Sequence, residues 1–299
     1  MITELFALPI NLKLVAKYHG QKLFSSDDLK KKLIQLIKES PRLKPVLKEV
    51  IKLVESNKII PIFANVGMIS HFIRILHAFT EDSNTAAFYS PETNKIYILI
   101  DNNINILGYV NNDFMAKLVL HEIIHMVANS KPNYFIVSFK PQLLIFYKEL
   151  FSIIFKLKDS KKSDLIIEDI YKSMFSSIEL NGSIHFKSFR IKFNSLKKYS
   201  SFSSIQFDEV LLDYFRIIKF HHTNQEDMIY NNKRYQYILQ APYHVYKSKF
   251  GFVPTGQYSI QRFMKSCLQE LSMPSEVICT LSEYKLQPEI YNAIKELAK

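Results

Sequence analysis

The sequence is poor in cysteine and glycine, and each shortage excludes a class of structure. Only two cysteines, Cys267 and Cys279, occur in 299 residues, which excludes a disulfide-held scaffold and any zinc site made of cysteines alone. Six glycines and eleven prolines argue against collagen-like, linker-rich and turn-dense all-β architectures. With 47% hydrophobic and 22% charged residues, the composition is that of a folded protein with a core.

The sequence also lacks a long uninterrupted apolar run. The N-terminus carries Glu4 and has no basic segment ahead of an apolar stretch, so we expect no secretory signal. The most apolar stretch, Leu143–Leu157, contains Lys148 and Glu149 and is shorter than the roughly 20 apolar residues that cross a membrane. We therefore expect no membrane span and a cytoplasmic location.

The positive charge is concentrated away from the centre of the chain. The net charge is +11, of which residues 1–60 contribute +6 and residues 61–140 contribute −1. The triple run Lys30–Lys32 lies in the N-terminal part, where helical spacing favours a solvated helix face. A nucleic-acid binder concentrates basic residues at its contacting element, so nucleic acid is not an expected partner.

Hydrophobic periodicity predicts a mostly helical chain of the α+β class. Helices are expected over residues 26–40 and 43–56, followed by a short strand over 59–64. We interpret residues 1–58 as an N-terminal helical segment and 59–299 as the main domain, with a helical insertion at about 141–200. One continuous domain is the alternative.

Near residue 90 the pattern changes from helical to extended. The turn-forming cluster Ser90–Asn94 separates Ala86–Tyr89 from the partly alternating tract Lys95–Asp101, which predicts a β-hairpin. The cluster Asn111-Asn112-Asp113 is a natural helix N-cap, so the next helix is expected to run from Asp113 to about Asn129, ahead of Lys131-Pro132.

This predicted helix carries the sequence His121-Glu122-Ile123-Ile124-His125, an HExxH motif. Residues four apart lie one helical turn above each other, so both imidazoles can reach one Zn²⁺ ion. Glu122 lies about 100° around the helix from His121, at ~3.6 residues per turn. It can therefore flank a metal without ligating it and act as a general base, then as an acid.

The hairpin and the HExxH helix together resemble the zincin metallopeptidases, at superfamily level and over about 45 residues. The resemblance implies a zincin-like core, in which a small antiparallel sheet packs on the HExxH helix, with helical insertions. It also implies that an edge strand, here Lys95–Asp101, binds the peptide substrate in extended form by strand addition. Ala128 and Lys131 stand where the metzincin pattern requires Gly and His, so that subclass does not fit.

The gluzincin-like pattern implies a Glu ligand on a later helix. Glu209 and Asp213 are four residues apart on an otherwise apolar helix that Ser203 and Gln206 can cap. We assign Glu209 as the third ligand and Asp213 as a partner that supports a ligand histidine. Three other residues compete for the third ligand position: Asp208, His185 and Glu179.

Such enzymes also use a Tyr or His side chain to stabilise the oxyanion. Tyr243 and His244 in Pro242-Tyr243-His244 are our candidates. The pair His221-His222 and Tyr230 are alternatives.

The function expected from these residues is zinc-dependent peptide-bond hydrolysis by metal-activated water, with Glu122 as general base. His121, His125 and Glu209 would hold the ion. The alternative is a zincin-fold structural or binding subunit of a larger assembly, for example a virion component, with little or no proteolytic activity.

Overall fold

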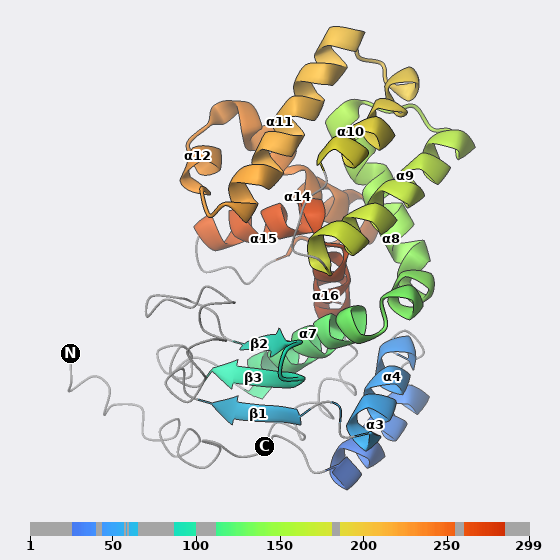
Figure 1. The fold of residues 1–299 in the computed structure, drawn as a ribbon, viewed down its shortest axis with the longest axis vertical. Coiled ribbons are helices and arrows are strands. Elements are labelled where there is room, and N and C mark those ends of the chain that lie inside the picture. Colours follow the sequence, from blue (N-terminus) through green and yellow to red (C-terminus); the bar gives the residue numbers. More distant parts are fainter. Residues whose placement is uncertain are drawn as a thin grey trace, which may run out of the picture. The chain divides into compact units, whose positions relative to one another are not determined.

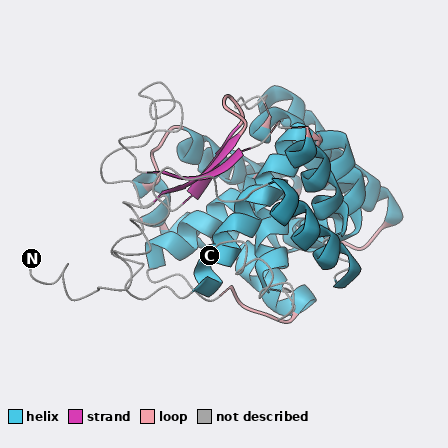
Figure 2. Cartoon of the chain, turned by 90° about the horizontal axis from the view of Figure 1, so that it is seen from below, coloured by secondary structure: helices cyan, strands magenta, loops and turns pink. Residues whose placement is uncertain are grey.

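A computed structural model of the chain describes residues 26–39, 44–56, 58, 60–64, 87–99, 112–180, 186–254 and 260–284. These residues are predominantly helical with one small sheet (Figure 1, Figure 2), which confirms the α+β class. They divide into two compact units: the described residues up to Lys131, and Pro132–Tyr284. The domain boundary expected at 58/59 falls inside the first unit.

The first unit begins with two amphipathic helices, α3 (Ser26–Glu39) and α4 (Lys44–Glu55). Leu33 and Leu36 of α3 and Val46 and Val50 of α4 are buried, and the two helices pack against each other. Spacings of three and four residues place these side chains on one face of each helix. The two predicted helices are thereby confirmed.

The sheet of the first unit has three strands, β1 (Ile60–Ala64), β2 (Ala87–Ser90) and β3 (Lys95–Leu99). The β2–β3 pair is the predicted antiparallel hairpin, closed by a four-residue turn that ends at Asn94 with a φ of 51°. Asparagine tolerates this left-handed conformation better than most residues. On one face, Phe88 stacks on Tyr97 with ring centroids 4.8 Å apart.

The expectation that Lys95–Asp101 forms an edge strand is wrong. The strand order is β1-β3-β2, so the described part of this tract, β3, is the central strand. Its second neighbour is β1, which pairs with it in parallel from Ile60↔Lys95 to Ala64↔Leu99. Both edges of β3 are therefore occupied, and it cannot accept an added strand. The described sheet is mixed rather than purely antiparallel.

The HExxH motif lies on α7 (Asn112–Ser130), close to the predicted range of 113–129. This helix packs against α4, β2 and β3. The Tyr89 hydroxyl donates a hydrogen bond to Asn94 Oδ1 at 3.2 Å, and burial raises the pKa of Tyr89. A helix packed on the hairpin was predicted, and the packing confirms it.

The described elements of the second unit are helices, apart from one β-bridge between Leu157 and Ser200. The apolar stretch that starts at Leu143 belongs to a longer helix that begins at Pro132. Proline fits this first helical position because the position needs no backbone N–H donor. In chain order the elements are α8 (Pro132–Phe155), α9 (Lys161–Met174), η2 (Phe175–Glu179), α10 (Phe186–Asn194), η3 (Lys197–Tyr199), α11 (Ser204–His222), α12 (Asp227–Tyr230), η4 (Lys233–Tyr235), α13 (Gln236–Leu239), α14 (Ala241–Val245), η5 (Tyr246–Phe250), α15 (Ile260–Ser272) and α16 (Pro274–Tyr284).

Aromatic side chains fill the core of the second unit. Phe155 contacts the rings of Phe193, Phe207 and Tyr214 at centroid distances of 5.2–5.9 Å, and all four side chains are buried. Such contacts add about 0.5–1.5 kcal/mol per pair beyond the burial of area. The aromatic residues thus hold α8, α10 and α11 together.

Of the helices that the structure describes, none combines the length and the apolar character needed to cross a bilayer.

Candidate metal centre on α7

The two motif histidines lie on the most accessible stripe of a deeply buried helix. From residue 118 to residue 129 of α7, four side chains are half-buried, Leu118, His121, His125 and Asn129, and the others are buried. These four are spaced by three or four residues and share one face of the helix. The two imidazoles are therefore partly exposed, whereas most of this segment is packed.

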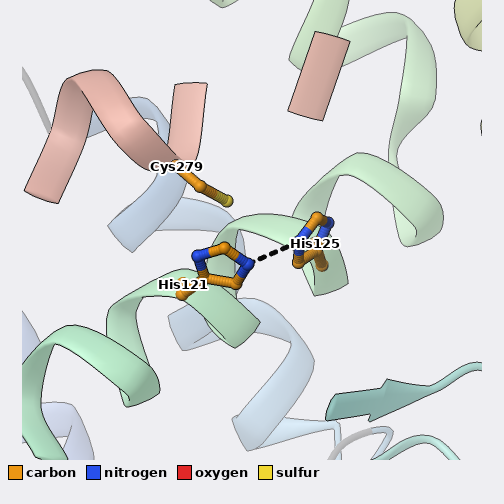
Figure 3. A group of neighbouring side chains, drawn as sticks. All are labelled: His121, His125 and Cys279. Atoms are coloured by element: carbon orange, nitrogen blue, oxygen red, sulfur yellow. Dashed lines mark hydrogen bonds between the residues drawn. The ribbon is translucent and has the colours of Figure 1, made fainter. Parts of the chain in front are cut away.

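The imidazoles of His121 and His125 converge on one point. Their Nε2 atoms are 3.0 Å apart, and the rings meet edge to face with centroids 4.7 Å apart (Figure 3). At this distance the two nitrogens form a hydrogen bond, in which one Nε2–H donates and the other Nε2 accepts. The backbone of α7 thus places two nitrogen ligands side by side.

This spacing fits a shared metal ion. Two nitrogen ligands at ~2.0–2.1 Å from Zn²⁺ in tetrahedral geometry are about 3.3–3.4 Å apart. The observed separation is a few tenths of an ångström shorter, which a small rotation of either ring corrects. In such a complex the ion would take the place of the proton between the two nitrogens.

Glu122 is buried, at 5% exposure. It follows His121 directly and precedes the buried Ile123 and Ile124. The carboxyl group of the motif is therefore shielded from bulk water, next to the stripe that carries the two imidazoles.

Glu209 and Asp213 lie one turn apart on α11, as predicted, but their surroundings differ. Glu209 is exposed. Asp213 is buried, accepts a hydrogen bond from Nε of Arg234 and has Arg216 Nη1 3.6 Å from its other oxygen. Two arginines therefore account for the charge compensation of Asp213. Both acids belong to the second unit, so their place at the metal stays a prediction.

The competing third ligands have their own partners in the second unit. Asp208 forms an ion pair with Lys197 at 2.7 Å. Glu179 Oε1 accepts a hydrogen bond from the backbone N–H of Ser275 at 2.8 Å, which caps the start of α16. His185 lies outside the described residues.

The predicted oxyanion donors also lie in the second unit. Tyr243 and His244 are neighbours on the short helix α14; Tyr243 is half-buried against Phe263 and His244 is exposed. Two of the alternative oxyanion donors, His221 and Tyr230, contact the same carboxylate. Glu226 lies 2.9 Å from Nδ1 of His221 and accepts a hydrogen bond from the Tyr230 hydroxyl at 3.1 Å. Figure 3 also draws Cys279, a buried cysteine of α16.

No protein-family model, curated protein or solved structure matches the chain.

Proposed function

We propose that the chain is a zinc-dependent metallopeptidase whose ion is held by His121 and His125. The observation that carries the proposal is the 3.0 Å separation of the two Nε2 atoms on the accessible stripe of an otherwise packed helix. A bound zinc ion would polarise the scissile carbonyl and lower the pKa of a water molecule to about 7.

Glu122 performs the proton transfers in this proposal. Its carboxylate takes a proton from the attacking water and passes it to the nitrogen of the leaving amine as the peptide bond breaks. The burial of Glu122 supports this role, because a carboxylate shielded from bulk water holds its proton between the two steps. Glu209 completes the protein ligands, Asp213 supports a ligand histidine, and Tyr243 or His244 stabilises the oxyanion.

The substrate in this proposal is a peptide bound in extended form. Because β3 is paired on both sides, we place the added strand on β2. This strand packs on α7, and its outer edge pairs with no strand among the described residues. Main-chain hydrogen bonds along β2 would hold the peptide beside the motif helix.

The test combines metal analysis with hydrolysis of a mixed fluorogenic peptide library by the purified full chain. Wild-type protein should contain one zinc ion per chain. Glu122→Gln should keep the zinc and lose hydrolysis by about 10²–10⁴-fold, the range of general acid–base catalysis. His125→Ala should lose both. Asn129→Ala changes the next residue on the same stripe and should keep the zinc.

A wild-type protein without zinc after purification in zinc-containing buffer would overturn the proposal. A second outcome is that wild type binds zinc, His125→Ala loses it, and no peptide is hydrolysed. That outcome would favour the alternative of a zincin-like structural or binding subunit. A panel of Glu209→Gln, Asp208→Asn, Glu179→Gln and Cys279→Ser then identifies the third ligand, because Zn²⁺ accepts carboxylate and thiolate ligands.

A further inference from the structure

A buried carboxyl group lies where four elements of the second unit meet. Glu270, in the last turn of α15, is 2% exposed. Its Oε1 accepts hydrogen bonds from the Tyr246 hydroxyl of η5 at 2.9 Å and from Thr280 Oγ1 of α16 at 2.7 Å. On α8, the Tyr147 hydroxyl donates to the backbone carbonyl of Glu270 at 3.3 Å. The side chain therefore connects α15 with α16 and η5.

The surroundings of Glu270 disfavour a negative charge. The last turn of a helix carries the negative end of its dipole, and α15 ends two residues after Glu270. Among the described residues, the titratable groups that interact with Glu270 are two tyrosines, one cysteine and two acids: Tyr147 on α8, Tyr246 of η5, Cys267 on α15, and Glu276 and Glu283 on α16. Tyr214 on α11 donates a hydrogen bond to the backbone carbonyl of the next residue, Leu271. Its two side-chain partners are hydroxyls, and no described cation forms an ion pair with it.

Burial raises the pKa of Glu270 to about 8, although the hydrogen bonds from Thr280 and Tyr246 act in the opposite direction. Oε1 accepts two hydrogen bonds, so in the neutral acid we expect Oε2 to carry the proton. Loss of this proton to solvent hydroxide leaves a buried anion that the acids Glu276 and Glu283 disfavour.

We propose that Glu270 is a proton-dependent latch, which fastens α15 to α16 and η5 while its carboxyl group is neutral and releases them when the carboxyl group ionises. Glutamate in an unfolded chain ionises near pH 4.3. Between that pH and about 8, the closed junction therefore binds one proton more than the opened one. Rising pH thus favours opening by about tenfold per pH unit. Above the pKa of Glu270 in the closed junction, a further rise in pH has no additional effect.

Hydrogen exchange of the full chain, followed peptide by peptide, tests the latch. At each pH from 5.5 to 9.5, wild type is compared with Glu270→Gln, so that the intrinsic pH dependence of exchange cancels. Amides of α15 and α16 should exchange faster in wild type relative to the variant by about tenfold per pH unit up to about 8, with no further increase above it. Amides of α9 and α10 should show a constant ratio.

Two controls keep the test decisive. Glu283→Gln removes a like charge that raises the pKa of Glu270, so it should keep the pH dependence and move its end point to lower pH. Infrared spectra of wild type should show the C=O stretch of one protonated carboxyl group at pH 6 and lose it by pH 9.5. A constant exchange ratio across the pH range, or the absence of that band at pH 6, would overturn the proposal.

Discussion

The carboxylate of Asp213, buried in α11, is held by the Nε–H of Arg234 from the short helical turn η4. Arg234 is 55% exposed at its side chain, whereas Asp213 is 5% exposed. The second oxygen of Asp213 is buried without a hydrogen bond, and Arg216 lies 3.6 Å from it. The acid thus depends mainly on one arginine for its compensation.

Replacing Arg234 should destabilise the second unit more than replacing both partners. Arg234→Leu leaves Asp213 buried with only the distant Arg216, and an uncompensated buried charge is costly. We expect the melting temperature of this variant to fall by several degrees. Asp213→Asn with Arg234→Leu should recover part of the loss, as a double-mutant cycle on thermal unfolding would reveal. Additive effects of the two substitutions would contradict the pairing.

Glu179 should matter for stability and not for metal binding. Its carboxylate accepts the Ser275 N–H at the start of α16, and hydrogen bonds to charged groups contribute about 1.5–3 kcal/mol. Glu179→Ala should lower the free energy of unfolding by about that amount in urea titrations. Zinc content should equal that of wild type, and a loss of zinc would instead restore Glu179 as a ligand candidate.

The start of α11 offers a test of local capping. Ser203 accepts the Gln206 N–H and the Gln206 side chain accepts the Ser203 N–H, forming a reciprocal capping box. Ser203→Ala should cost about 1 kcal/mol. Ser204→Ala, one residue later, serves as the matched control and should have less than half that effect. Equal losses in the two variants would show that the capping box contributes nothing.

Zinc should raise the thermal stability of the chain through His121 and His125. A ligand present at 100 times its Kd adds about 2.7 kcal/mol to the free energy of unfolding. Differential scanning calorimetry with and without Zn²⁺ should show this gain in wild type, and EDTA should reverse it. The same shift in His121→Ala would place the ion elsewhere. This readout does not depend on finding a substrate.

Local sequence signals predicted the elements that local interactions determine. The turn cluster before Lys95 predicted the β2–β3 hairpin, the Ser203–Gln206 spacing predicted the start of α11, and the HExxH spacing predicted that the two imidazoles approach each other. In each case the partners are close in the sequence, from three residues apart in the capping box to at most eleven, Ala87↔Ile98, in the hairpin. Such contacts require no knowledge of the remaining chain.

Interactions between residues far apart in the sequence were not predicted. The tract from Lys95 was expected at the edge of the sheet, but β1 pairs with it from 35 residues upstream. Asp213 was assigned to support a histidine, and its observed partners are Arg234 and Arg216. Glu270 was not predicted as a buried acid. Its spacing from the buried Cys267 and Leu271 nevertheless places it on the apolar face of α15. That pattern is visible in the sequence.

The parallel pairing of β1 with β3 also sets an order of assembly. The hairpin closes over a turn of four residues and costs little chain entropy, whereas β1 must return across more than thirty residues to reach its register. Loop-closure entropy therefore favours formation of the hairpin before β1 docks. A ribosome-bound chain that has just released residue 99 already holds every described strand of this sheet, so these strands can pair before the motif helix emerges.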